Sequence, residues 1–177
     1  MRPTSEILAA LVSRLEAVQW NASPAFHAVH RYDSNRLSEA FQELILAPHP
    51  RLALVVWTGE RWEIDPASTL RRARRATLVT LVLSDRVLGS REDAATWGDA
   101  TTPGVIRLKD LVIPAVTGRI LANPNGIDCF PGAIEPLPIL TEGAETGSAA
   151  MGRVALTIDL ECHGGAIDPT PSPGPVR

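Results

Sequence analysis

The sequence predicts an α+β domain in which about three helices flank a mainly antiparallel sheet. Residues 74–86 form a nearly unbroken run of strand-forming residues that is apolar on both faces, which is typical of a central strand covered on each side. Residues 5–18, 37–45 and 105–121 instead repeat their apolar side chains at helical spacing. We expect long loops between these elements.

At the N-terminus, Thr4 or Ser5 can cap the first helix. A short strand is expected at residues 26–32. The capping signal at residues 33–35 then predicts a second amphipathic helix over residues 37–45.

A hairpin is expected before the central strand. Residues 51–57 are a short apolar strand, and Thr58-Gly59-Glu60 has the composition of a turn into a partner strand at residues 61–65. Trp57 and Trp62 would then flank the turn and pack across the two strands.

After the central strand, residues 87–104 are polar and small, which predicts a long loop that contains Trp97. The following helix, residues 105–121, contains Pro114, which should kink it or start a new turn.

The last third of the chain is expected to form strands and a tail. Two prolines within residues 134–142 favour an edge strand. Residues 153–163 alternate apolar and polar side chains, as a half-exposed antiparallel strand does. We expect a single domain over residues 1–163 and a flexible, proline-rich tail over residues 164–177.

Composition narrows the function classes. The chain has 177 residues, 45% of them hydrophobic, and a net charge of −3, which excludes a disordered chain and a strongly basic nucleic-acid binder. Lys109 is the single lysine, and no glycine loop precedes it, so the sequence has no P-loop. The N-terminus lacks a signal-peptide pattern, and no stretch reaches the ~18 apolar residues of a membrane helix. We expect synthesis in a reducing cytoplasm and no membrane partner.

The sequence contains no motif that predicts a catalytic, cofactor-binding or metal site, so we expect neither an enzyme nor a cofactor. His27 and His30 are three residues apart, and on a strand this spacing directs them to opposite faces. Cys129 and Cys162 form no C-x-x-C pair. A disulfide between them is possible, although a reducing compartment disfavours it.

Three features are candidate interaction sites. The arginine run at residues 71–75 can contact phosphates or an acidic partner surface, or it can be the solvated start of a strand. Trp97 can anchor an interface or pin its own loop to the core. The two carboxylates on the last strand can do acid–base chemistry if buried, but as outward residues they favour solvated charges or inter-subunit ion pairs. The candidate interface residues are Arg71, Arg72, Arg74, Arg75, Trp97, Asp159 and Glu161.

Several segments follow one another in a recognisable order over residues 5–163. An N-terminal amphipathic helix precedes D-S-N-R-L-S-E-A-F, R-L-A-L-V-V-W and T-L-V-T-L-V-L-S-D-R, and the strand R-V-A-L-T-I-D-L closes the series. This order resembles the tail terminator (tail-completion) proteins of tailed bacteriophages, including the small tail proteins of Mu-like prophages.

The resemblance implies a small α+β subunit of the virion that forms a hexameric ring. Such a ring caps the tail tube, stops its polymerisation and docks the tail to the head or neck. The implied partners are copies of the same chain, the tail-tube protein, the sheath protein where the tail has one, and a neck or head-completion protein. DNA would pass through the ring without sequence recognition. Two alternatives stay open: a head-completion or neck adaptor protein, and a small enzyme or ligand-binding domain.

Overall fold

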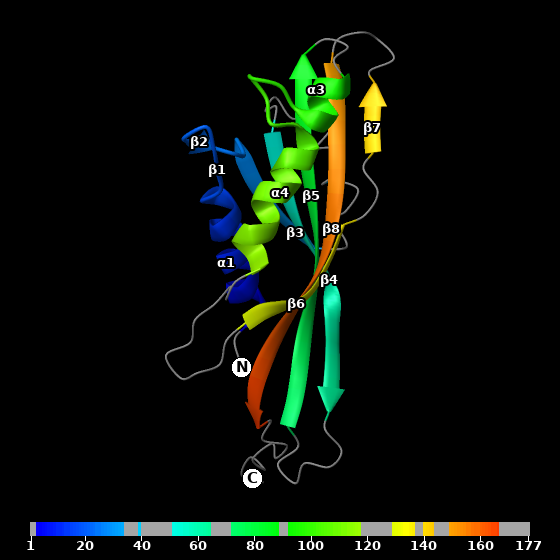
Figure 1. The fold of residues 1–177 in the computed structure, drawn as a ribbon. Coiled ribbons are helices and arrows are strands. Elements are labelled where there is room, and N and C mark those ends of the chain that lie inside the picture. Colours follow the sequence, from blue (N-terminus) through cyan, green and yellow to red (C-terminus); the bar gives the residue numbers. More distant parts are fainter. Residues whose placement is uncertain are drawn as a thin grey trace, which may run out of the picture.

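A computed structural model describes residues 3–33, 39, 51–64, 72–88, 92–117, 129–136, 140–143 and 149–166. These residues form a mixed α+β fold with helices against a mainly antiparallel sheet, which confirms the predicted fold class (Figure 1). The helices are α1 (Thr4–Glu16), α3 (Glu92–Trp97) and α4 (Gly104–Thr117). The strands are β1 (Gln19–Trp20), β2 (Ser23–Pro24), β3 (Ala28–Asp33), β4 (Arg51–Ile64), β5 (Arg72–Leu88), β6 (Cys129–Pro136), β7 (Leu140–Gly143) and β8 (Ala149–Ala166).

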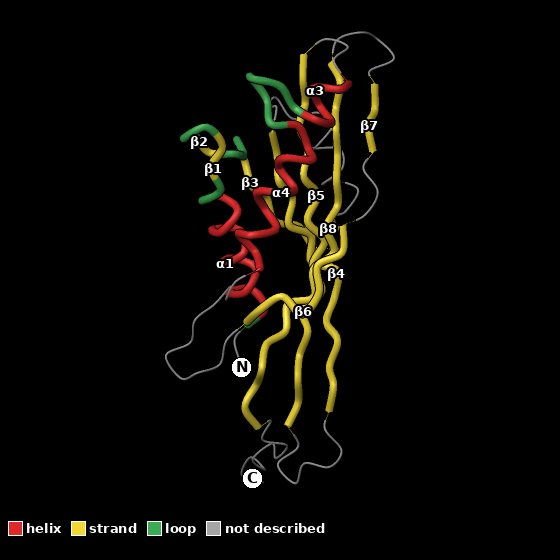
Figure 2. Tube along the Cα trace, in the orientation of Figure 1, coloured by secondary structure: helices red, strands yellow, loops and turns green. Residues whose placement is uncertain are grey.

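The main sheet has six strands, and five of them follow the order β3-β4-β5-β8-β6, with β7 also paired to β8 (Figure 2). The β3–β4 pair is parallel, and the other pairs of this sheet are antiparallel. β5 lies between β4 and β8, so the prediction of a central strand is confirmed. β1 and β2 form a separate small antiparallel pair.

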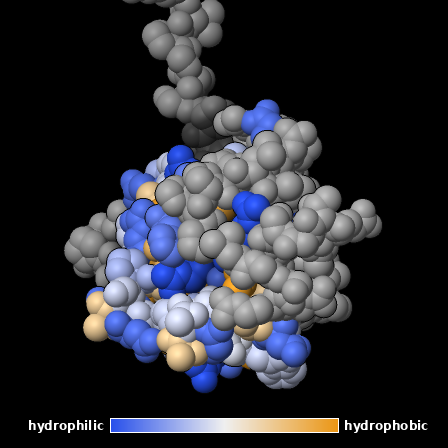
Figure 3. All heavy atoms as spheres, turned by 90° about the horizontal axis from the view of Figure 1, so that it is seen from above, coloured by the Kyte–Doolittle hydropathy of each residue, from blue (hydrophilic) through white to orange (hydrophobic). Residues whose placement is uncertain are grey.

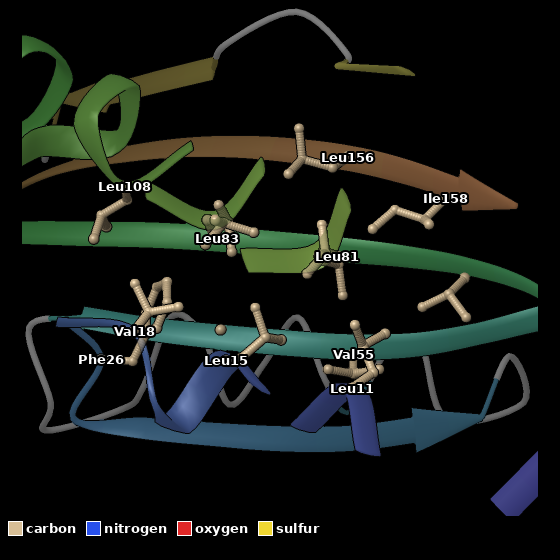
Figure 4. Packing of buried hydrophobic residues seen from close by; sticks show 14 of the residues in the cluster. Leu11, Leu15, Val18, Phe26, Val55, Leu81, Leu83, Leu108, Leu156 and Ile158 are labelled. Carbon is tan, nitrogen blue, oxygen red and sulfur yellow. The ribbon is translucent and has the colours of Figure 1, made fainter. Parts of the chain in front are cut away.

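The main core lies between one face of the sheet and the helices α1 and α4 (Figure 4). Each helix has an apolar stripe at helical spacing, and Val79, Leu81 and Leu83 of β5 meet these stripes from the sheet. The opposite face of the sheet is also buried at Leu54, Val56 and Val82, with Tyr32 packed against them. Both faces of β5 are therefore covered around residues 79–83, as the composition of the strand predicts. Labelled core residues in Figure 4 are Leu11, Leu15, Val18, Phe26, Val55, Leu81, Leu83, Leu108, Leu156 and Ile158.

The start of α1 differs from the expectation. Pro3 is the N-cap residue, and no side chain caps the helix, so the prediction that Thr4 or Ser5 does so is wrong. The Thr4 hydroxyl instead donates a hydrogen bond to the Glu60 carboxylate of β4. A tertiary contact has replaced the local one.

The predicted hairpin at residues 58–60 is also wrong, because β4 is one continuous strand of 14 residues. The register against β5 shifts between Trp57 and Gly59, so the turn-like composition marks a β-bulge. Gly59 has a φ of 147°, which side-chain-bearing residues rarely adopt. Trp57 and Trp62 consequently lie along one strand and do not pack across a turn.

The predicted loop at residues 87–104 contains regular structure. β5 continues to Leu88, and α3 occupies Glu92–Trp97. α3 is too short to show a helical apolar period, and among its described side chains it buries the small residues Ala94 and Ala95. The helix after it is confirmed as α4, with Pro114 inside it.

The C-terminal segments form strands, as predicted, but the strands begin and end at other residues than expected. The segment expected as one edge strand over residues 134–142 contributes to two, β6 and β7, and within the described residues both pair only with β8. β8 itself extends to Ala166, three residues past the expected end of the domain at residue 163. The predicted helix over residues 37–45, apart from Glu39, and residues 167–177 of the predicted tail lie outside the described residues.

Candidate functional site

The sheet is longer than the helical layer that covers it. In Figure 1 the lower parts of β4, β5 and β8 run past α1 and α4 as a three-stranded ribbon. We call this ribbon the projecting end and define it as residues 60–64 of β4, 72–77 of β5 and 160–166 of β8, which are neighbours in the strand register. It contains the predicted arginine run, apart from Arg71, and one of the two predicted carboxylates.

Glu60 organises one face of the projecting end. Its carboxylate accepts the hydrogen bond from Thr4 at the start of α1. It also accepts one from the indole Nε1 of Trp62 at 3.3 Å, and Nη1 of Arg75 lies 3.8 Å from it. One side chain therefore connects the first helix to the two central strands.

Trp62 is held in place although it is exposed. Its indole Nε1 is hydrogen-bonded to Glu60, and the Arg75 guanidinium carbon lies 5.7 Å from its ring centre, within cation–π range. Trp62 is 46% exposed, whereas Arg75 is only 6% exposed. Arg75 is therefore not the solvated charge that one interpretation of the arginine run expected. Its buried guanidinium instead packs against the exposed indole ring of Trp62.

The opposite face at the base of the projecting end carries a surface ion pair. Nη2 of Arg61 lies 3.0 Å from Oδ2 of Asp159, so the pair spans the sheet across β5. Asp159 thus has a partner within its own chain. The Arg61 side chain is 52% exposed, and pairs of this kind contribute little to stability.

Trp97 lies at the other end of the sheet, as the last residue of α3. It is 64% exposed, so its ring does not pin this segment to the core. Its helix is anchored instead by Ala94 and Ala95, which form a small buried cluster with Val87 of β5. Gly152 of β8 allows the close approach, since a Cβ there would lie 2.3 Å from the Ala95 carbonyl oxygen.

A buried carboxylate that the sequence reasoning did not single out starts α4. Oδ2 of Asp85 accepts hydrogen bonds from the Thr102 hydroxyl at 2.5 Å and the Gly104 amide at 2.8 Å. Burial raises the pKa of Asp85, and the hydrogen bonds from Thr102 and Gly104 oppose that shift. Asp85 has no exposed surface, and its two hydrogen bonds anchor the start of the helix. The available signal was an acidic residue in a strand that is apolar on both sides of it, at residues 81–83 and 87–88.

The structure therefore does not bring all the predicted interface residues together in one place. Arg75 joins Glu60 and Trp62, Asp159 pairs with Arg61, and Trp97 lies at the far end. Arg71 lies outside the described residues, as do the side chains of Arg72, Arg74 and Glu161.

The described residues show no arrangement for metal chemistry. No group of three or more His, Cys, Asp or Glu side chains within them is placed to hold a metal ion. His30 lies in β3, whereas His27 precedes that strand and its backbone amide donates to the Arg51 carbonyl at 2.9 Å. Nor does any described helix have the length and hydropathy to cross a membrane.

At the end at which α3 lies, the described residues present a mainly hydrophilic surface. Seen from above, the coloured atoms in Figure 3 are mostly hydrophilic, and the hydrophobic areas between them are small and separate. An isolated aromatic side chain on such a surface can anchor a contact without a continuous apolar patch.

Comparison with known proteins gives no family for the chain. No protein-family model matches the sequence, and no curated protein is significantly similar to it.

Proposed function

We propose that the protein is a structural virion subunit, a bacteriophage tail terminator that assembles with copies of itself into a hexameric ring. The resemblance in the order of sequence segments suggests the family. The observation that best supports the proposal is the pair of exposed tryptophans, Trp62 and Trp97, at opposite ends of one long sheet.

Ring closure explains why two different surfaces are needed. Subunits that meet head to tail use two different patches, and they close a ring when the rotation between neighbours allows it. Trp62 and Trp97 belong to elements with different neighbours, so they supply two such patches. We infer that the Trp62 surface of one subunit meets the Trp97 surface of the next.

The Trp62 surface has the properties of a strong contact. Tryptophan and arginine are enriched among residues that dominate binding free energy. Glu60 and Arg75 already fix the orientation of the Trp62 indole, so this side chain has little freedom left to lose on binding. A rigid aromatic side chain at the edge of a projecting ribbon is therefore suited to self-association.

The proposed ring acts through contacts alone. It would cap the last tier of the tail tube, stop tube growth and present its other side to the neck or head-completion protein. DNA would pass through it unread, and the chain would be made in the cytoplasm of the bacterial host. No catalytic residue or cofactor is part of this proposal.

The test compares assembly and tube capping. The full chain, mixed with the tail-tube protein of the same phage or prophage, is measured by light scattering and electron microscopy. We expect a hexamer at tube ends and shorter tubes than without it. Trp62→Ala and Trp97→Ala should each lower the fraction of capped tubes at least tenfold, whereas Arg107→Ala, an exposed change on α4, should not.

Other outcomes would contradict the proposal. Tubes that grow equally long with and without the protein would exclude a terminator. Binding to the portal or neck protein without binding to tubes would favour the adaptor alternative instead. A turnover activity of the single subunit would favour the enzyme alternative.

A further inference from the structure

The strand register places the two cysteines of the chain opposite each other. Cys129 begins β6, and in the antiparallel pairing of β6 with β8 its direct partner is Cys162. The sequence contains only these two cysteines, which lie far apart along it. Residues in direct register share one face of the sheet, and alternation along β8 puts Cys162 on the face of Ile158 and Leu160.

The backbone spacing of such a pair suits a disulfide. Directly opposed residues of antiparallel strands have Cα atoms about 4.5–5.5 Å apart. Disulfides occur at Cα separations of about 4.4–6.8 Å, so the bond requires no separation or sliding of the strands. From this register we propose that Cys129 and Cys162 form an intramolecular disulfide that fastens β6 to β8 when the surroundings are oxidising.

The location gives the bond a structural effect. Among the described strands β6 lies at the edge of the sheet, and Pro131 and Pro136 lack the amide hydrogen that a strand ladder uses. Its register against β8 also shifts between Pro131 and Ala133. The same strand carries Ile134, which packs against the core. A covalent link at residue 129 therefore strengthens the weakly bonded strand that borders the core.

The chemistry is thiol–disulfide exchange with a low-molecular-weight disulfide such as oxidised glutathione. One cysteine thiolate attacks the glutathione disulfide, forms a mixed disulfide and releases one glutathione thiolate. The second cysteine thiolate then attacks the mixed disulfide, closes the protein bond and releases the second glutathione. The two cysteines lose their protons and are oxidised, and one glutathione disulfide is reduced to two thiols. A reducing cytoplasm keeps the bond open.

The experiment equilibrates the full chain, dilute, with mixtures of reduced and oxidised glutathione and then blocks free thiols. Intact mass and peptide mapping should show a monomer lighter by two hydrogens, with Cys129 joined to Cys162. Oxidation should raise the melting temperature by roughly 5–15 °C, since the bond closes a long loop. Cys129→Ser and Cys162→Ser should each abolish both changes.

The comparison of reduced and oxidised wild-type protein needs no variant, so it holds even if a serine variant fails to fold. Glutathione attached to both cysteines, or crosslinked dimers in place of the internal bond, would overturn the proposal. An internal bond without a rise in melting temperature would overturn the claim that it fastens β6. None of these results depends on whether the protein assembles into a ring.

Discussion

Asp85 is a buried carboxylate whose ionisation should affect stability. Burial raises its pKa above the ordinary value of 3.8, because the charged form loses hydration. The folded state then holds the proton more tightly than the unfolded state. The stability that this proton contributes is fully present below pH 3.8 and is lost as the pH rises through the raised pKa.

Asp85→Asn should remove this pH dependence while an amide oxygen still accepts from Thr102 and Gly104. The free energy of unfolding of the wild type minus that of the variant should increase as the pH falls from neutral toward 3.8. The slope inside the window cannot exceed about 1.4 kcal/mol per pH unit, the limit for one proton. Urea unfolding at a series of pH values measures it. A difference that stays flat, or decreases on acidification, would show that the folded state does not raise the pKa of Asp85.

Gly152 permits the close contact between β8 and α3. An added Cβ would lie 2.3 Å from the carbonyl oxygen of Ala95 and 2.9 Å from its carbon, and backbone atoms cannot turn aside as a side chain can. Gly152→Ala should therefore lower the free energy of unfolding by about 1–3 kcal/mol, the usual cost of overpacking. Chemical denaturation measures the change, and Thr58→Ala, at an exposed position of β4, is the control. Equal stabilities for the two variants would contradict the contact.

At the scale of elements, α4 keeps a proline that a helix does not favour. Pro114 lies inside α4, is exposed, and cannot donate the hydrogen bond that an amide there would give to the Asp110 carbonyl. The helix persists because its stripe of Val105, Leu108, Val112 and Val116 is fully buried. Burial of that stripe outweighs the local cost of the proline.

Pro114→Ala should stabilise the protein by about 1–2 kcal/mol. The restored hydrogen bond and the better helix propensity favour the folded state, and the greater freedom of the unfolded chain offsets part of the gain. The midpoint of urea unfolding should rise accordingly. Asp110→Ala, on the exposed surface of the same helix, should change stability by no more than about 0.5 kcal/mol. A loss of stability in Pro114→Ala would mean that the pyrrolidine ring of Pro114 makes a stabilising contact in the folded protein.

At the scale of the whole molecule, Trp62 and Trp97 lie at opposite ends of the sheet. This separation follows from the length of the sheet and could not be seen from their order in the chain. β4 carries Trp62 away from the helical layer, while α3 carries Trp97 at the end where β5 stops and β8 begins (Figure 1). A subunit with different surfaces at its two ends can form a head-to-tail contact with each neighbour. The proposed ring therefore requires each subunit to use both ends.

Mixing two defective subunits tests that arrangement. A Trp62→Ala subunit keeps its Trp97 surface, and a Trp97→Ala subunit keeps its Trp62 surface. Under conditions in which the wild type forms hexamers, each variant alone should be monomeric, and an equimolar mixture should form dimers and nothing larger. Light scattering gives the mass. Hexamers from either variant, or from the mixture, would exclude contacts that depend on these two side chains.

The candidate site shows how far sequence reasoning reaches. Trp97, Arg75 and Asp159 stood out because aromatic and charged residues in polar surroundings are conspicuous. Their contacts were not predicted, because Glu60 and Trp62, expected in and after a turn, become neighbours of Thr4 and Arg75 only through a strand that continues past a bulge. The composition of Thr58-Gly59-Glu60 favours a turn, and pairing with β5 overrides that local preference.

The sequence by itself determined the fold class, the central strand β5 and the amphipathic helices α1 and α4, because the period of apolar residues is a local property that burial then satisfies. Tertiary structure alone decided the length of β4, the helix α3, the burial of Asp85 and the opposition of Cys129 and Cys162. Each of these depends on the register between segments that are distant in the chain. Register is set by the sum of many cross-strand contacts, and no short stretch of residues contains that sum.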